Sequence, residues 1–249
     1  EVNSGQDINK MNRAFLRAKV RVDATENLRF NFIADFTRRK EDCCAAVLSR
    51  RGAVFPRVEA LAAGKGYKNS GAVDPYEREA AITPGRINQE DVTDFGFSGQ
   101  MDWDMGFGQL VTISAYRKWK ANRGQDFDHS GVDLGYIDKD GLRMGFTQFT
   151  QEVRLQGSTP KLDWLVGGYY SHQEIFQDFA YRMGASYADF YGGAAAFKPA
   201  TLAAWKPGDG ARGISEQEGD DFALFTNNTW HVTDKFGLTA GLRYTRNEK

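Results

Sequence analysis

The feature that most limits the fold of this chain is a set of extended segments in which apolar and polar residues alternate. In the segment 28–39, Leu28, Phe30, Phe32 and Phe36 fall on one side of a period-two pattern, and polar residues fall on the other. A strand with this pattern has one apolar face and one polar face. If the apolar face met lipid, the polar face would line a lumen and one set of loops could grow freely, as in an outer-membrane barrel.

Composition narrows the classes of protein that the chain can belong to. It has 249 residues, of which 41% are apolar and 13% are aromatic, which is enough for a large ordered structure. The formal charge of -1 gives no overall field that would recruit nucleic acid. A mean hydropathy of -0.55 argues against membrane helices, but a barrel strand turns only alternate residues toward lipid.

Eight segments with this alternation pair into four hairpins. Short links follow the first, third, fifth and seventh segments, and long connections follow the second, fourth and sixth. The facing of the fourth and seventh segments stays open. The predicted strands are 12–23, 28–39, 92–104, 109–120, 146–156, 162–175, 221–231 and 236–246.

The loop lengths favour one architecture. Short turns at one edge and long loops at the other are typical of an up-and-down barrel in an outer membrane. The predicted fold class is therefore all-β, a partial antiparallel transmembrane β-barrel with about eight strands. Aromatic residues near the short turns would form the girdle at the periplasmic interface, although they can also be ordinary core residues at strand ends. These residues are Trp103, Phe107, Trp164, Trp230 and Phe236.

Three of the predicted hairpins carry a resemblance to a known family. Residues 222–246 read FALFTNNTWHVTDKFGLTAGLRYTR and resemble a strand–turn–strand segment that recurs in the barrels of TonB-dependent outer-membrane receptors. The GLRYT that ends at Thr245 is its most recognisable part. Residues 146–157 (FTQFTQEVRLQG), followed by LDWLVGGYY from Leu162, and residues 113–119 (ISAYRKW) are similar to other hairpins of that family.

The resemblance implies a barrel of about 22 strands with a plugged lumen. Receptors of this family take up scarce nutrients such as ferric siderophores, haem, cobalamin or oligosaccharides, with energy transmitted by TonB. It therefore implies a multi-pass barrel in the outer membrane of a Gram-negative bacterium, with no cofactor. The implied partners are outer-membrane lipid, the TonB complex and a small-molecule nutrient, with a ferric siderophore or similar iron complex as the first expectation.

The sequence departs from a full receptor in three respects. It has no plug domain, no TonB box and no closing C-terminal strand that ends in an aromatic residue. Residues 1–249 are thus expected to be part of a barrel domain, and TonB would act through a plug outside this sequence. Three alternatives stay open: a passive porin with an open polar lumen, a complete small barrel of eight strands, and a soluble all-β binding module.

No pattern of catalytic or metal-ligating residues stands out, so an enzyme is not expected. The three histidines lie on different segments, away from metal-ligand spacing. The aspartates of segment 126–140 contain a fragment of calcium-loop spacing without the ordered ligand series or the closing Glu, so a solvated loop is predicted. Cys43 and Cys44 are candidates for a loop disulfide, with each other or with parts outside the sequence, and free thiols are the alternative.

Aromatic rings concentrate in the long connection after the sixth predicted strand. In an extracellular vestibule such rings could hold a flat or apolar ligand by stacking or by cation–π contact. Packing within the loop is the alternative, and the sequence favours it. The candidate ligand-binding rings are Phe179, Tyr181, Tyr187, Tyr191 and Trp205, and Phe190 and Phe197 lie in the same segment.

Charged residues lie on the polar faces of the predicted strands, where they would point into a lumen. Their simplest role is to hydrogen-bond a plug and lumen water. The predicted lumen-facing residues are Arg17, Lys19, Arg21, Arg29, Glu152, Arg154 and Arg243.

Overall fold

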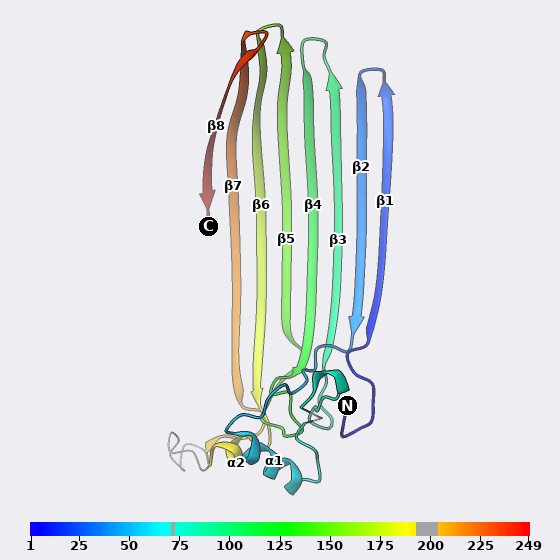
Figure 1. Cartoon of the computed structure of the whole chain (residues 1–249), viewed down its shortest axis with the longest axis vertical. Helices are drawn as coiled ribbons and strands as arrows, with labels where there is room; N and C mark the ends of the chain where they lie inside the picture. The colour runs from blue at the N-terminus through cyan, green and yellow to red at the C-terminus, as the bar shows by residue number, and fades with distance from the viewer. Residues whose placement is uncertain (71–72, 193–203) are drawn as a thin grey trace.

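Eight antiparallel strands form one continuous sheet in the computed structural model, which describes residues 1–70, 73–192 and 204–249 (Figure 1). Each strand pairs with its neighbours in chain order. The strands are β1 (Met11–Thr25), β2 (Leu28–Glu41), β3 (Gln89–Asp104), β4 (Gln109–Asp126), β5 (Gly135–Thr159), β6 (Leu162–Met183), β7 (Gly210–Thr233) and β8 (Phe236–Glu248). In this described sheet β1 and β8 do not pair, so the sheet is open. The predicted partial up-and-down architecture is confirmed, and the closed barrel of eight strands is not formed.

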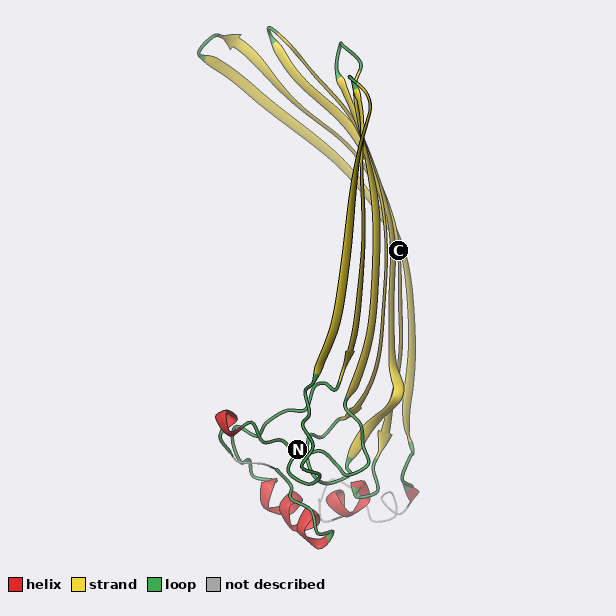
Figure 2. Cartoon of the chain, turned by 90° about the vertical axis from the view of Figure 1, so that its right-hand side faces the viewer, coloured by secondary structure: helices red, strands yellow, loops and turns green. Residues whose placement is uncertain are grey.

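The two ends of the sheet differ in their connections. Turns join the two strands of each hairpin, whereas longer segments join β2 to β3, β4 to β5 and β6 to β7. The longer segments hold α1 (Phe55–Gly64), the 3-10 helix η1 (Pro75–Glu77) and α2 (Tyr187–Tyr191). Figure 2 shows the helices gathered beyond one end of the strands, opposite the turns. No described helix is long and apolar enough to cross a membrane.

The strand register divides the sheet into an apolar face and a polar face. One row of opposing residues across β2 to β5 consists of Ala34, Phe97, Tyr116 and Phe149. Phe97 is 46% exposed and Phe149 is 39% exposed, although both side chains are large and apolar. Contiguous exposed rings on one face are typical of a surface that meets lipid or another protein instead of water.

The register also gives the facing of β4 and β7, which the sequence left open. Val111 of β4 lies opposite Arg154 of β5 and belongs to the polar face. Leu224 of β7 lies opposite Tyr244 of β8 on the apolar face. Val111 is only 2% exposed, whereas Leu224 is 54% exposed.

β5, β6 and β7 are longer than the sequence predicted. They contain 25, 22 and 24 residues, whereas the predicted strands were 146–156, 162–175 and 221–231. At about 3.3 Å per residue, β5 is roughly 80 Å long, far more than the ~25 Å apolar band of a membrane barrel. The backbone ladder continues where the apolar alternation has ended, and for this reason the period-two pattern missed the outer parts of these strands.

Candidate functional site

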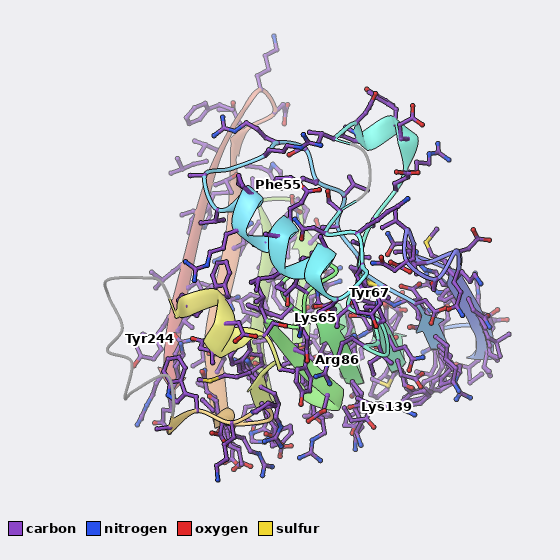
Figure 3. All side chains as sticks on the ribbon, turned by 90° about the horizontal axis from the view of Figure 1, so that it is seen from below. Phe55, Lys65, Tyr67, Arg86, Lys139 and Tyr244 are labelled. Atoms are coloured by element: carbon purple, nitrogen blue, oxygen red, sulfur yellow. A yellow bond between two sulfur atoms is a disulfide. The ribbon has the colours of Figure 1, made fainter. Side chains whose placement is uncertain are left out.

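A small folded unit lies at the loop end of the sheet (Figure 3). Its centre consists of the buried side chains of Val58 and Ala62 from α1 and Val132 from the segment after β4. Leu61, Leu134 and Phe190 pack around this centre. We call the unit the loop module and define it as residues 45–70, 80–88, 127–134 and 184–191. In Figure 3, α1 lies across the strand ends, with Phe55 at one end of the helix and Lys65 at the other.

Two hydrogen bonds fix α2 against α1. The Lys65 Nζ atom donates to Ser186 Oγ at 2.6 Å, immediately before α2 begins. The Arg57 Nη2 atom donates to the carbonyl oxygen of Asp189 at 3.1 Å, and the same guanidinium lies 5.7 Å from the centre of the Phe190 ring. Because α2 has only five residues, its own backbone hydrogen bonds contribute little stability, and these tertiary contacts position it.

Three of the five candidate ligand-binding rings meet on and beside α2. The centre of the Tyr187 ring lies 4.7 Å from that of Tyr191 and 4.9 Å from that of Trp205. All three side chains are half-buried. The structure therefore brings together rings that are far apart in the segment, while Phe197 lies outside the described residues.

Tyr181 joins these rings from the end of β6. Burial raises the pKa of the Tyr181 phenol, and the neighbouring Tyr187 and Tyr191 add to the shift. The Tyr181 ring also packs edge-on against Phe127 at 5.4 Å. We call Tyr181, Tyr187, Tyr191 and Trp205 the ring cluster. Phe179 does not belong to it, and both Phe179 and Tyr181 lie within β6 instead of in the loop that the sequence suggested.

Acidic residues organise the backbone of the loop module. Asp128 accepts hydrogen bonds from the backbone N–H groups of Ser130 (3.0 Å), Leu134 (3.1 Å) and Gly135 (3.0 Å). Asp133 accepts two hydrogen bonds from Arg86, one from Nε at 2.9 Å and one from Nη2 at 2.8 Å. It also accepts one from the backbone N–H of Ala185 at 2.9 Å. The prediction of a solvated loop is therefore wrong for this part of segment 126–140, because its carboxylates bind the loop backbone.

Asp126 is the most deeply buried of these carboxylates. It ends β4 with no exposed surface, and its Oδ2 atom accepts a hydrogen bond from the Thr83 backbone N–H. Its Oδ1 atom has no hydrogen-bond partner among the described residues. Burial, together with nearby Asp128, raises the pKa of Asp126 to about 7. The carboxyl group is therefore largely protonated in mildly acidic solution.

All seven residues predicted to face a lumen lie on the polar face of the sheet. Four of them form ion pairs near the turn end of the sheet. Asp23 accepts hydrogen bonds from Arg21 at 3.1 Å and from Arg29 at 2.9 Å. The Arg154 Nη1 atom donates to Glu152 at 3.1 Å, and both side chains are partly buried.

The other three predicted lumen-facing residues have fewer contacts. Arg17 and Lys19 lie on β1 and form no ion pair with the described part of the chain. The guanidinium carbon of Arg243 lies 5.5 Å from the centre of the Phe225 ring. The plug and water contacts predicted for all seven residues stay a prediction.

Sequence reasoning missed an ion pair that crosses three strands of the polar face. Arg117 of β4 donates to Asp35 of β2 at 2.8 Å and to Asp94 of β3 at 2.5 Å. Gly96 of β3 lies between them, and a Cβ atom there would be 2.9 Å from Arg117 Nη2. The absence of a side chain at Gly96 therefore leaves room for the guanidinium. A glycine opposite an arginine in the middle of a predicted strand was the available signal.

A second network joins the outer ends of β1 to β4. The carboxylates of Glu41 and Glu90, with the Cys43 sulfur, lie within 4.8 Å of one another and could in principle hold a metal ion. The carboxylates instead pair with arginines, and the Cys43 sulfur is bonded to Cys44. These arginines are Arg13 and Arg39 on Glu41, and Arg39 and Arg123 on Glu90. The positive charge of these arginines neutralises the negative charge of the two carboxylates, which a bound cation would need.

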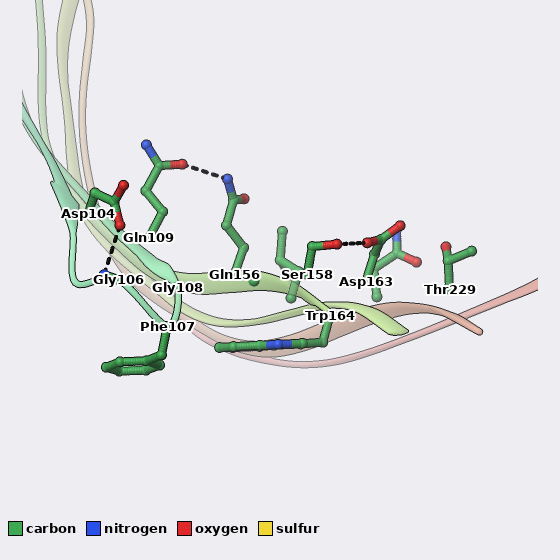
Figure 4. A pocket seen from close by; sticks show the side chains of 13 residues that line it. Asp104, Gly106, Phe107, Gly108, Gln109, Gln156, Ser158, Asp163, Trp164 and Thr229 are labelled. Carbon is green, nitrogen blue, oxygen red and sulfur yellow. Dashed lines mark hydrogen bonds between the residues drawn. The ribbon is translucent and has the colours of Figure 1, made fainter. Parts of the chain in front are cut away.

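The five predicted girdle residues lie at the turn end of the sheet, and two of them, Phe107 and Trp164, line a hollow of about 710 Å³ (Figure 4). The Trp164 ring covers Gly157, where a Cβ atom would be 2.6 Å from the indole. Polar and apolar groups line the hollow in about equal measure, and one of the polar groups is Gln156, whose amide donates to Gln109 at 2.8 Å. It lies at the opposite end of the strands from the ring cluster, so it is a separate feature. The girdle role of the aromatic residues stays a prediction.

One sequence family and two solved structures are similar to this chain. The sequence family described as TonB dependent receptor-like, beta-barrel matches residues 49–249. Among solved structures, the chain is similar to the ferric yersiniabactin uptake receptor FyuA from Yersinia pestis, with a TM-score of 0.62 and 16% identity over 99% of this chain and 31% of the receptor. The outer membrane transporter YddB from Escherichia coli gives a TM-score of 0.40 and 11% identity over 95% of this chain and 34% of the transporter. No curated protein sequence matches.

These matches differ in what they establish. The chain spans about a third of the length of FyuA, and at 16% identity this likeness concerns the fold alone. The family match establishes more than the fold, because the family model covers most of the chain, including β3 to β8 and much of the loop module. The chain therefore belongs to the TonB-dependent receptor-like β-barrel family.

Proposed function

We propose that the chain is part of the barrel domain of an outer-membrane receptor for active uptake of a scarce nutrient, with a ferric siderophore or similar iron complex as the nutrient class. Residues 1–249 would supply part of a multi-pass barrel in the outer membrane of a Gram-negative bacterium. The TonB complex would act through a plug domain outside these residues. Family membership supports the proposal, and so does the fold likeness to FyuA, whose name states uptake of ferric yersiniabactin.

The observation that carries the proposal is the ring cluster at the loop end. Its rings come from the end of β6, from α2 and from the segment before β7, and the ring centres of Tyr191 and Trp205 each lie within 5 Å of that of Tyr187. Because the side chains are half-buried, part of each ring packs in the module and part stays accessible to a ligand. Stacking of a ligand on such rings requires little further ordering of the protein, since Arg57 and Lys65 already hold α2 in place.

The experiment is alanine substitution in the complete receptor. The triple variant Tyr187→Ala, Tyr191→Ala, Trp205→Ala is expected to bind the ferric siderophore at least about tenfold more weakly, because each lost ring removes about 1 kcal/mol of stacking. Binding is measured by titration of purified receptor with a panel of ferric siderophores. The control is Tyr76→Ala, because Tyr76 is 90% exposed on η1 and does not belong to the ring cluster.

Two further measurements separate the outcomes. Heat-modifiable migration in gels reports whether each variant keeps its folded barrel, and unchanged affinity in a folded triple variant would contradict ligand binding by the ring cluster. Uptake of the radiolabelled iron complex in cells with and without TonB tests the transport step. Equal uptake in both strains would instead indicate a passive porin.

A further inference from the structure

The apolar face acquires positive charge toward the loop end, on one side of the sheet. In one row, Phe36 of β2 and Phe95 of β3 lie beside Lys118 of β4. In the next row toward the loops, Arg38 of β2 and Lys120 of β4 are separated by a single residue of β3. Neighbouring strands are about 4.8 Å apart, so the backbones of Arg38 and Lys120 are about 10 Å apart. We call Arg38, Lys118 and Lys120 the basic patch.

The basic patch is exposed and has no internal counter-charge. All three side chains are exposed, and none forms an ion pair or side-chain hydrogen bond with the residues that the structure describes. Lys40 continues the positive charge by one row, but it lies 4.0 Å from Asp91. Three cations gathered on one surface without partners repel one another, so a bound anion would stabilise them.

The height of the patch matches the edge of the apolar band. Trp103 marks the turn end of β3, and Phe95 lies eight residues before it on the same face. Eight residues of a strand cover about 27 Å along the strand, and a strand tilt of ~40° leaves roughly 20 Å of height, comparable to the ~25 Å apolar band of an outer-membrane barrel. Lys118 lies in the row of Phe95, so the patch begins where the acyl chains of the outer leaflet would end and the head groups would begin.

The same two rows carry the opposite charge on the far side of the sheet. The row of Lys118 continues through β5 to Glu174 of β6 and Glu218 of β7. The row of Lys120 continues to Glu216 of β7. Along the same two rows of the sheet, the face is therefore basic over β2 to β4 and acidic over β6 and β7.

We propose that the basic patch binds the phosphate groups of an anionic lipid of the outer leaflet. Lysine and arginine form charge-assisted hydrogen bonds to phosphate oxygens, and the exposed rings of Phe36 and Phe95 directly below offer apolar surface for the acyl chains. The acidic side of the same rows would repel such head groups, so the lipid would occupy one side of the barrel. The inference rests on the proposed membrane location of the chain.

The test measures lipid binding to the complete gene product in detergent. The probe is lipopolysaccharide, compared with the same lipid after enzymatic removal of its phosphates, and bound lipid is counted by native mass spectrometry. The patch variant is Arg38→Gln, Lys118→Gln, Lys120→Gln. It is expected to bind the phosphorylated lipid about a hundredfold more weakly, since each Lys or Arg near an anionic lipid surface contributes roughly a fivefold factor.

A matched control uses the acidic side. The variant Glu174→Gln, Glu216→Gln, Glu218→Gln changes the net charge by the same amount in the opposite direction and lies in the same rows. Its affinity for the phosphorylated lipid is expected to change less than threefold. An increase as large as the loss in the patch variant would show that net charge alone decides binding and would overturn a local site.

Two other outcomes would also overturn the proposal. One is equal affinity of the native protein for the phosphorylated and dephosphorylated lipids, and the other is unchanged affinity of a folded patch variant. Insertion into phosphatidylcholine vesicles, monitored by protease protection, is measured in parallel. If the native protein does not insert, the proposed outer-membrane function fails, whereas insertion without a patch effect contradicts the lipid site alone.

Discussion

Replacement of Asp126 by asparagine is expected to stabilise the loop module, and to do so by more at pH 8 than at pH 5. In the folded module, burial and nearby Asp128 raise the pKa of Asp126 from its ordinary 3.8 to about 7. A carboxyl group whose pKa is raised in the folded state contributes stability while it is protonated, and this contribution is lost as the pH rises through 7. Between pH 5 and pH 8, the free energy of opening the module should fall by roughly 3 kcal/mol, on the order of a hundredfold change in the opening equilibrium.

Hydrogen exchange of backbone amides in the loop module measures this opening. Peptides that contain Thr83 are the most direct reporters, because the Thr83 N–H donates to the Asp126 carboxylate. After correction for the intrinsic pH dependence of exchange, protection in the native protein should fall from pH 5 to pH 8, while the Asp126→Asn variant should show a nearly flat profile. Asp140→Asn is the control, since Asp140 is exposed. Equal protection of the native protein and the Asp126 variant at pH 8 would refute the reasoning.

Two further substitutions test the contacts that position the sheet and the loop module. Gly96→Val should lower the free energy of unfolding by about 1–3 kcal/mol, because the new side chain would displace the Arg117 guanidinium. Gly213→Val should have little effect, because nothing lies within 4 Å of a Cβ atom there. Urea unfolding in detergent compares the two variants, and equal midpoints would contradict the prediction. Arg86→Lys loses the two-pronged hydrogen bond to Asp133 and should destabilise the loop module by about 1–2 kcal/mol. Faster proteolysis of the module with an unchanged strand core is the expected readout, and an unchanged cleavage rate would count against the role of this ion pair.

The alternation of apolar and polar residues predicts the membrane-level part of this fold well. Leu28, Phe32 and Phe36 fall on one face, and the register of β1 to β3 places the predicted apolar residues opposite one another. The pattern fails for β4, because Val111 and Ile113 are aliphatic yet lie on the polar face. Strand pairing decides that facing, and a single strand cannot reveal its partners.

The candidate site was only partly predictable from the sequence. The abundance of rings in one segment pointed to Tyr187, Tyr191 and Trp205, and the structure brings these three together. The residues that hold them could not be found in this way, because Lys65 reaches Ser186 across 121 positions of the chain. Contacts over such separations depend on the folded arrangement and leave no local pattern.

The length of β5, β6 and β7 has a mechanical consequence for the entrance of a receptor. The loop module is carried on a ladder of paired backbones that continues far past the apolar band, and not on free loops. To move Tyr181, thermal motion would have to bend several hydrogen-bonded strands together, which is much stiffer than the swing of a single loop. In the proposed receptor, a ligand at this part of the rim would therefore meet a stiff surface, and most of the entropy lost on binding would be lost by the ligand and not by the protein.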